Sequence, residues 1–207
     1  MIVAINALFY LGQQVSPDIT LRLASIAPAI AAGEWYRLLT PMVLHANLLH
    51  ILFNSYVFWI YGPELERPLG TVRFLATYVI SGFIGSAASY ALGDCTGYGV
   101  GASGAILGVM GALLVYLYRR RTSASADYFF RGLVGLVALN LVISFFWPVI
   151  DEWAHVGGLV GGILMGGIFD QHKRSRPDLT WQIINTLAVV ALGVALVVWR
   201  TTTFTCP

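Results

Sequence analysis

The fold is decided by the apolar stretch VGASGAILGVMGALLVYLY at residues 100–118, which carries no charge and places Ser103 near its start. A second stretch, AHVGG at residues 154–158, places His155 near the start of another apolar segment. An isolated polar side chain is costly in hydrocarbon, so an ionisable residue within a membrane span is a functional hypothesis by default. We therefore expect a nucleophile and its base to meet inside a lipid bilayer.

Composition excludes a soluble globular domain. Hydrophobic residues make up 57% of the chain and charged residues only 11%, with a mean hydropathy of +0.75, whereas soluble domains carry about 25% charged residues. The 207 residues hold several spans of about 20 residues but no sizeable soluble domain. The small net charge of +2 gives no reason to expect a nucleic-acid partner.

Apolar stretches between charges and turn residues predict an all-α membrane protein. The seven candidate spans are residues 1–15, 43–62, 70–92, 100–118, 129–147, 153–169 and 181–199. Residues 16–42 form a long first loop, which we expect to lie partly in the membrane interface. We group residues 1–169 as a six-helix core, residues 170–180 as a cytoplasmic basic loop, and residues 181–207 as a seventh helix with an outer tail.

The positive charges predict the orientation. With a cytoplasmic N-terminus, the inner loops hold nine basic residues, namely Arg67, Arg73, Arg119, Arg120, Arg121, Arg131, Lys173, Arg174 and Arg176. Only Arg22, Arg37 and Arg200 then lie outside. Because inner loops are enriched in Lys and Arg, we expect a multi-pass protein of a cell membrane, with its N-terminus inside and its C-terminus outside. The short chain argues against an organellar form, so we expect the membrane to be that of a prokaryote.

Three polar residues share one predicted depth. The distance of each residue from the first charged residue at the inner end of its own helix gives its depth. This separation is sixteen residues for Ser103, fifteen for His155 and fourteen for His50. At a rise of about 1.5 Å per residue, these separations are about 24, 22 and 21 Å. All three residues therefore fall a few ångströms below the outer boundary of the hydrocarbon core, within reach of outer water. His45 falls near the outer rim.

Small residues follow both candidate positions. Glycines recur four apart after the serine and after the histidine, at Gly104, Gly108, Gly158 and Gly162. This spacing lets helices approach closely in lipid, as a hydrogen bond between Ser103 and His155 requires. A neutral imidazole takes the hydroxyl proton during attack on a carbonyl and returns it to the leaving amine. No carboxylate is predicted at this depth, so we predict a Ser-His dyad without a cofactor or metal.

The negative charge formed by such an attack needs hydrogen-bond donors. Ser103 lies near a helix N-terminus, where backbone N–H groups lack partners within the helix. His50 and Asn54 are four residues apart and therefore share one face of a helix. We predict an oxyanion hole formed by these two side chains and the backbone N–H of Ser103.

Each of these residues also occurs in membrane proteins for reasons unrelated to catalysis. A serine in a glycine-rich span packs helices together, a buried histidine stabilises a helix contact or relays a proton, and His50 with Asn54 bonds neighbouring helices. A small transporter or a zinc site could use His45, His50 and His155, although carboxylate and thiolate ligands are missing at their depth. The close-packing glycines and the shared depth favour the catalytic interpretation.

Three motifs together resemble the rhomboid family of intramembrane serine proteases. They are HANLLHILFN at residues 45–54, the GxSGxxxG run at residues 101–108 and the AHxxGxxxG run at residues 154–162. The resemblance covers roughly residues 34–169 and implies a six-helix bundle followed by a seventh helix. It implies that Ser103 is the nucleophile and His155 the general base, and that single-span transmembrane proteins are cut near their outer ends. Auxiliary roles are implied for His45, Gly101, Tyr36 and Arg37.

The resemblance has departures and a rival. Where many relatives have Trp-Arg in the first loop, this chain has Tyr36-Arg37, and where an aromatic residue often packs against the catalytic histidine it has Leu107. Leu107 leaves the orientation of His155 open. In the family, substrates enter near the fifth helix beneath a cap loop, here about residues 148–153. The rival is an inactive relative that binds membrane proteins without cutting them, and the presence of both the serine and the histidine argues against it.

The two cysteines, Cys95 and Cys206, both fall on the outer side in this topology. In an oxidising compartment, a disulfide would tether the tail of the seventh helix to the loop that precedes the catalytic serine. Two free thiols fit the sequence equally well, because the sequence gives no distance between them.

Overall fold

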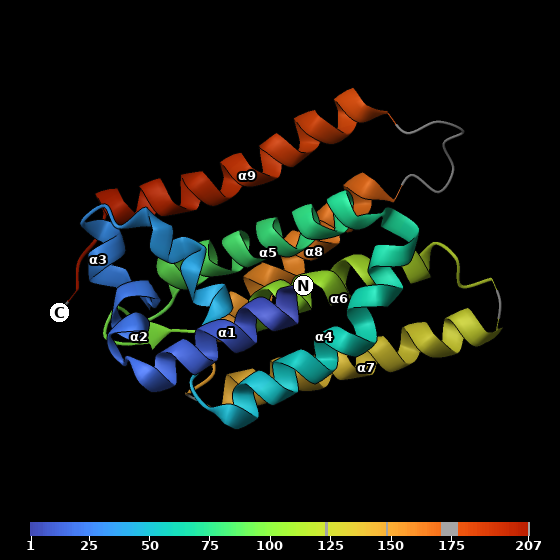
Figure 1. The fold of residues 1–207 in the computed structure, drawn as a ribbon. Coiled ribbons are helices and arrows are strands. Elements are labelled where there is room, and N and C mark those ends of the chain that lie inside the picture. Colours follow the sequence, from blue (N-terminus) through green and yellow to red (C-terminus); the bar gives the residue numbers. More distant parts are fainter. Residues whose placement is uncertain (123, 148, 171–177, 207) are drawn as a thin grey trace.

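The computed structural model describes residues 1–122, 124–147, 149–170 and 178–206. They form a bundle of long helices, with short elements gathered at one end (Figure 1). The long helices are α1 Ile2–Val15, α4 Leu48–Leu69, α5 Thr71–Leu92, α6 Ser103–Tyr118, α7 Ala124–Phe146, α8 Glu152–Phe169 and α9 Leu179–Thr202. The short elements are α2 Asp18–Leu23, β1 Ser25–Ile26, α3 Ala27–Ala31, η1 Trp35–Leu38, η2 Thr40–Val43 and β2 Tyr98–Gly99.

Two predicted segments fall partly outside the described residues. Lys173, Arg174 and Arg176, which carry the charge of the predicted basic loop at residues 170–180, lie outside them, as does Pro148 in the predicted cap loop. The predicted first loop, in contrast, is fully described and contains the five elements from α2 to η2.

Within the described residues, three helices are long and apolar enough to cross a membrane: α5, α7 and α9. Helices α1 and α6 are apolar but shorter. Helix α4 differs from the predicted span at residues 43–62, because the Asn47 side chain caps it by accepting from the backbone N–H of His50 at 2.9 Å. It then continues through Pro63 and Pro68 to Leu69, although each proline removes one backbone donor.

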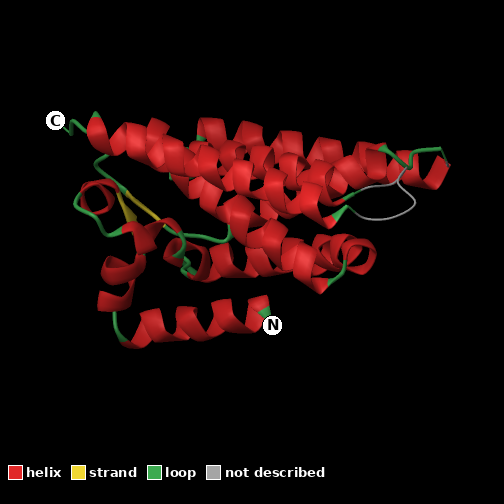
Figure 2. Cartoon of the chain, turned by 90° about the horizontal axis from the view of Figure 1, so that it is seen from above, coloured by secondary structure: helices red, strands yellow, loops and turns green. Residues whose placement is uncertain are grey.

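Helices α5, α6 and α8 pack against one another in the middle of the bundle. Helices α4 and α7 also contact α6, whereas α9 runs along α5 (Figure 1). Every residue of α6 from Gly104 to Leu113 is buried, which explains why this stretch is apolar and uncharged throughout. Seen from above, α1 lies at the edge of the molecule (Figure 2), where it contacts α4 and η2.

Glycines bring the backbones of α6 and α8 into direct contact. A Cβ added to Gly158 would overlap the carbonyl oxygen of Gly104, and one added to Gly162 would overlap that of Gly108. Gly85 on α5 is equally restricted, because its Cβ would lie 2.6 Å from the carbonyl oxygen of Ala154. Packing between small residues of this kind is the usual way in which helices associate in lipid.

The short elements are tied to the bundle at one end. β1 pairs antiparallel with β2, with Ser25 opposite Gly99 and Ile26 opposite Tyr98. A disulfide joins Cys95 to Cys206 across a Cα–Cα distance of 5.9 Å, and this decides the question that the sequence left open. The disulfide attaches the chain after α9 to the segment between α5 and α6.

At the opposite end, ion pairs join the residues that follow α6 to the residue that follows α8. Asp170, which is almost fully buried, accepts two hydrogen bonds of 2.8 Å from the guanidinium group of Arg120. Arg119 lies 3.6 Å from the same carboxylate and donates to the backbone oxygen of Asp170. A paired, bidentate carboxylate of this kind satisfies a charge that would otherwise be costly to bury.

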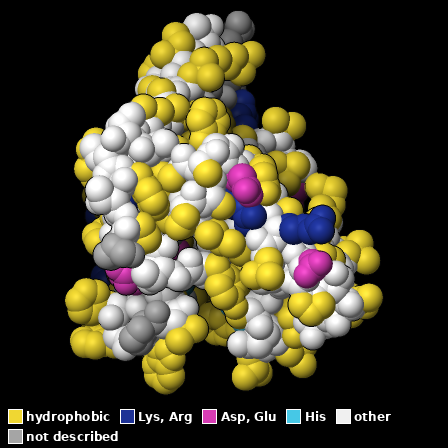
Figure 3. All heavy atoms as spheres, turned by 90° about the vertical axis from the view of Figure 1, so that its left-hand side faces the viewer, with side chains coloured by type: hydrophobic (Ala, Val, Ile, Leu, Met, Phe, Trp, Pro, Cys, Tyr) yellow, Lys and Arg dark blue, Asp and Glu magenta, His cyan; other side chains and the backbone are white. Residues whose placement is uncertain are grey.

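The surface has the character of a membrane protein. Large apolar side chains such as Trp59 on α4, Phe145 on α7 and Leu187 on α9 are exposed. In the end view, a few charged side chains are surrounded by apolar ones (Figure 3). Extensive apolar surface is unfavourable in water but matches a hydrocarbon environment.

Candidate active site

The start of α6 depends on Gly101. Its φ of +136° belongs to a region that L side chains rarely adopt, and its backbone N–H donates to the carbonyl of Pro41 at 3.0 Å. A Cβ at this position would lie 2.9 Å from Nε2 of His50 and 3.6 Å from Oγ of Ser103. The missing side chain therefore lets the His50 ring lie close to the serine.

The start of α8 is fixed by Asp151. One carboxylate oxygen accepts from the backbone N–H of Ala154 at 2.9 Å, and the other accepts from the Ser89 hydroxyl of α5 at 2.5 Å. Burial raises the pKa of this carboxyl above its ordinary value, and the hydrogen bond from Ser89 opposes that effect. Asp151 therefore caps α8 and ties it to α5, one turn before His155.

Ser103 and His155 are brought together by these two helix starts. Nε2 of His155 lies 2.7 Å from Oγ of Ser103, and the histidine is only 5% exposed. Nucleophile–base hydrogen bonds are expected at about 2.6–3.2 Å. With Nε2 unprotonated, the imidazole is positioned to remove the hydroxyl proton.

The other ring nitrogen of His155 contacts a residue that the sequence motifs did not single out. Nδ1 lies 2.6 Å from Oγ of Ser144 on α7. The only sequence signal was a serine four residues after Asn140 in an otherwise apolar span, a pattern equally typical of helix packing. The sequence around Ser144 did not indicate that this residue contacts His155.

The predicted oxyanion donors come from α4. Asn54 is 5% exposed, and its Nδ2 finds no hydrogen-bond partner among the described residues. The backbone N–H of Ala46 donates to Nδ1 of His50 at 3.4 Å, so in the neutral ring the proton resides on Nε2, the atom beside Gly101. Among the described residues Asn54 thus has an uncommitted, buried N–H, whereas buried polar groups are normally satisfied.

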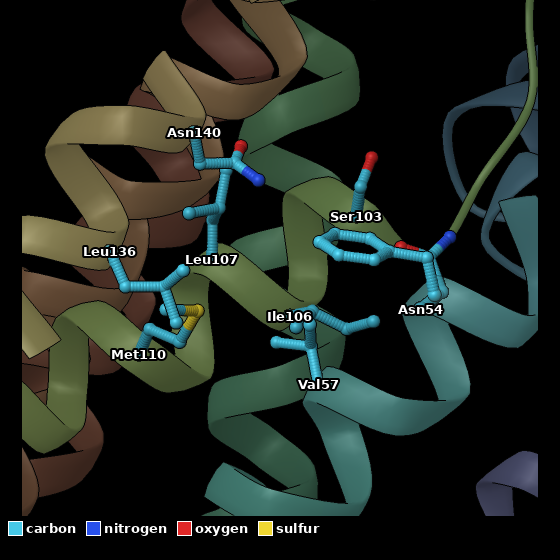
Figure 4. A pocket seen from close by; sticks show the side chains of 9 residues that line it. Asn54, Val57, Ser103, Ile106, Leu107, Met110, Leu136 and Asn140 are labelled. Carbon is cyan, nitrogen blue, oxygen red and sulfur yellow. The ribbon is translucent and has the colours of Figure 1, made fainter. Parts of the chain in front are cut away.

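A small cavity of about 20 Å³ opens beside the serine. Its lining comes from α4, α6 and α7: Phe53, Asn54, Val57, Ser103, Ile106, Leu107, Met110, Leu136 and Asn140. Figure 4 shows Asn54 and Ser103 on one side, and Leu136 and Asn140 on the other. Leu107 therefore lines the same cavity as the serine.

The predicted auxiliary residues fall into two groups. Gly101 and His45 lie near the pair: His45 is 1% exposed, and its ring meets that of His50 edge to face at 5.2 Å. Tyr36 and Arg37 instead belong to the first loop. Both donate to Glu34, and Arg37 also donates to backbone carbonyls at the end of α2.

The described residues contain no group of three or more His, Cys, Asp or Glu side chains arranged to hold a metal ion.

This chain is similar in sequence to known proteins over most of its length. The profile of the Rhomboid domain matches residues 32–172. YdcA of Bacillus subtilis (strain 168) is 39% identical over 147 residues, which cover 71% of this chain and 73% of YdcA. Rhomboid protease GluP of the same organism is 35% identical over 169 residues, 80% of this chain and 32% of GluP. RHOMBOID-like protein 6, mitochondrial, of Arabidopsis thaliana is 39% identical over 152 residues, 70% of this chain and 47% of the relative.

The chain belongs to the rhomboid family. It spans about three quarters of YdcA but only about a third of GluP and half of the Arabidopsis protein. The family is generally one of intramembrane serine proteases, so the comparisons confirm the resemblance inferred from the three sequence motifs.

Proposed function

We propose that this protein is an intramembrane serine endopeptidase in which Ser103 is the nucleophile and His155 the general base. The observation that carries the proposal is the 2.7 Å contact between Oγ of Ser103 and Nε2 of His155, made between two helices whose glycines bring them together. Membership of a family that generally consists of such proteases supports it.

In the proposed reaction, His155 takes the hydroxyl proton as Ser103 attacks a substrate carbonyl. The resulting oxyanion accepts hydrogen bonds from the backbone N–H of Ser103, Nδ2 of Asn54 and Nε2 of His50. The imidazolium returns the proton to the departing amine, which leaves an ester on Ser103. A water, activated by the same imidazole, then hydrolyses the ester and restores the hydroxyl.

The proposed setting is a cell membrane of a prokaryote. The six-helix core would extend from α1 to α8 and α9 would be the seventh span, with the N-terminus cytoplasmic and the C-terminus outside. The site would then lie just below the outer boundary, and single-span transmembrane proteins would be cut near their outer ends. The distribution of Lys and Arg along the sequence supports this orientation.

The test is cleavage of a single-span substrate that carries small and helix-breaking residues near its outer end. Wild-type protein in detergent or liposomes should produce two fragments, and Ser103→Ala or His155→Ala should lower turnover at least about 10³-fold. Ser81→Ala is the matched control, because Ser81 is a fully buried helical serine on α5 whose hydroxyl has no hydrogen-bond partner among the described residues. A chelator should have no effect.

A covalent serine-hydrolase probe gives an independent readout. It should label wild type and Ser81→Ala but not Ser103→Ala. Cleavage that persists in Ser103→Ala, or that stops with the chelator, would refute the dyad. Folded wild type that neither cleaves nor reacts with the probe would instead support an inactive relative that binds membrane proteins.

A further inference from the structure

We propose that Ser144 is a positioning residue that fixes the tautomer and the ring orientation of His155. The proposal rests on the proposed function for its catalytic meaning, but its structural content can be tested without catalysis. The observation is a chain of three short contacts that runs from Ser103 through His155 and Ser144 to the backbone of α7.

The direction of these hydrogen bonds follows from the last one. The Ser144 hydroxyl lies 2.7 Å from the carbonyl oxygen of Asn140, and a carbonyl can only accept. The single hydroxyl proton therefore points to Asn140, and Oγ of Ser144 faces Nδ1 of His155, at 2.6 Å, with a lone pair. Nδ1 must then carry the imidazole proton, which leaves Nε2 as the acceptor for the Ser103 hydroxyl.

Burial makes this assignment firm. Ser144 is 1% exposed and its contact with Nδ1 of His155 is buried, so water does not compete for these two atoms. The opposite tautomer would direct the proton of Ser144 to Nδ1 and place its lone pairs against the carbonyl of Asn140. It would also turn Nε2 into a donor, which cannot accept the proton of Ser103. A buried polar group left without a partner is costly.

Ser144 also holds the ring of His155 by a hydrogen bond, which Leu107 cannot form. Leu107 lies on α6 one turn after Ser103 and lines the same cavity (Figure 4), and its side chain neither donates nor accepts. A hydroxyl from α7 holds the ring from its other edge. During the reaction the same hydroxyl accepts from the imidazolium without bringing a second charge into a low-dielectric site, where an isolated carboxylate is expensive.

The tautomer can be measured directly in protein labelled with ¹⁵N in its histidine rings. The Ser103→Ala background removes hydrolysis, and comparison with a His155→Gln sample identifies the His155 signals among the four histidines. At mildly alkaline pH we expect protonated Nδ1 and unprotonated Nε2. Adding Ser144→Ala should convert this pattern to Nε2–H or to an exchanging mixture, whereas adding Ser81→Ala should leave it unchanged.

Kinetics provide the second test. Ser144→Thr and Ser144→Val have nearly equal volumes and strain the packing similarly, but only Thr keeps the hydroxyl. We expect Thr to retain most of the kcat of the wild type and Val to lose about tenfold in kcat, with little change in KM, because the substrate does not contact residue 144. Ser81→Ala should retain wild-type kinetics.

The two hypotheses fail in different ways. An Nε2–H tautomer in the Ser144 wild-type background, or equal kcat for the Thr and Val variants, would overturn the role of Ser144. Unchanged cleavage in Ser103→Ala would overturn the proposed function while leaving the tautomer result intact. If Ser144→Val fails to fold, the comparison of Ser144→Ala with Ser144→Thr by NMR decides the question.

Discussion

Asn54 carries a buried amide whose Nδ2 has no hydrogen-bond partner among the described residues, one turn after His50 and beside the cavity at Ser103. A donor left free in the resting protein is what an oxyanion hole requires, because its bond forms as charge develops on the substrate. The arrangement therefore gives a specific kinetic expectation for this residue.

Asn54→Ala should lower kcat by about 10²-fold, the usual effect of losing one oxyanion donor, and less than Ser103→Ala does. Initial rates over a range of substrate concentrations measure it. Asn185→Ala on α9 is the control, since within the described part of the chain the Asn185 side chain donates to a backbone carbonyl of its own helix and to no other group. A loss as large as that of Ser103→Ala would contradict an auxiliary role.

The buried carboxyl of Asp151 leads us to expect that the stability of the protein depends on pH. Burial raises the pKa of its carboxyl above the ordinary 3.8, so the folded protein binds the proton more tightly than the unfolded chain. The ionised carboxylate is therefore destabilising in the folded protein. This loss of stability develops as the pH rises from 3.8 through the raised pKa. Asn keeps an acceptor for Ala154 and gains a donor toward Ser89 without the charge.

Asp151→Asn should therefore be at least as stable as wild type at neutral pH, and this advantage should vanish in acid. Asp151→Ala loses the cap and should be less stable by about 1 kcal/mol. Thermal unfolding in detergent across pH measures both variants. If Asn and Ala destabilise the protein equally at neutral pH, the interpretation of Asp151 is wrong.

At the scale of helices, the contact between α6 and α8 determines whether the site forms. Gly158 and Gly162 of α8 lie against the backbone of α6 at Gly104 and Gly108. Interiors packed this closely cannot absorb an added methyl group without moving a helix. The distance between Ser103 and His155 therefore depends on residues that take no part in chemistry.

Gly162→Ala tests this dependence. We expect a loss of stability of about 1–3 kcal/mol or more and a large loss of probe labelling at Ser103. Gly167→Ala on the same helix is the matched control, because its Cβ would meet nothing within 4 Å. Equal effects of the two substitutions would show that backbone contact is not the cause.

At the scale of the whole molecule, the disulfide between Cys95 and Cys206 closes a loop of 111 residues. In the chain-entropy account, a loop of about 100 residues contributes up to about 4.7 kcal/mol. It connects the end of α9 to the segment that leads into Ser103, so its loss should loosen α9 more than the catalytic pair.

Cys206→Ser should therefore lower the unfolding temperature while cleavage at low temperature continues. A reducing agent should lower the unfolding temperature of wild type to that of the variant and leave the variant unchanged. Mass spectrometry of the two peptides should show the bond before reduction. Free thiols in the untreated protein would refute it.

Particular residues show how much of the site and of the fold could be predicted from the sequence. Ser103, His155, His50 and Asn54 were selected from motif spacing and helix depth, and the structure brings them to one place. The ends of α4 were predicted less well, because Asn47 capping and the continuation through Pro63 depend on local contacts. The pair of β1 and β2 joins residues more than 70 positions apart, beyond the reach of any local pattern.

Composition and short motifs are local properties, so the amino-acid sequence was enough to predict a helical membrane protein of the rhomboid family and to select the candidate residues for chemistry. The partner of Nδ1 of His155, the disulfide and the capping link from Asp151 to Ser89 became visible in the folded chain alone. Each of these joins different elements of the fold, and such contacts arise when helices pack in three dimensions.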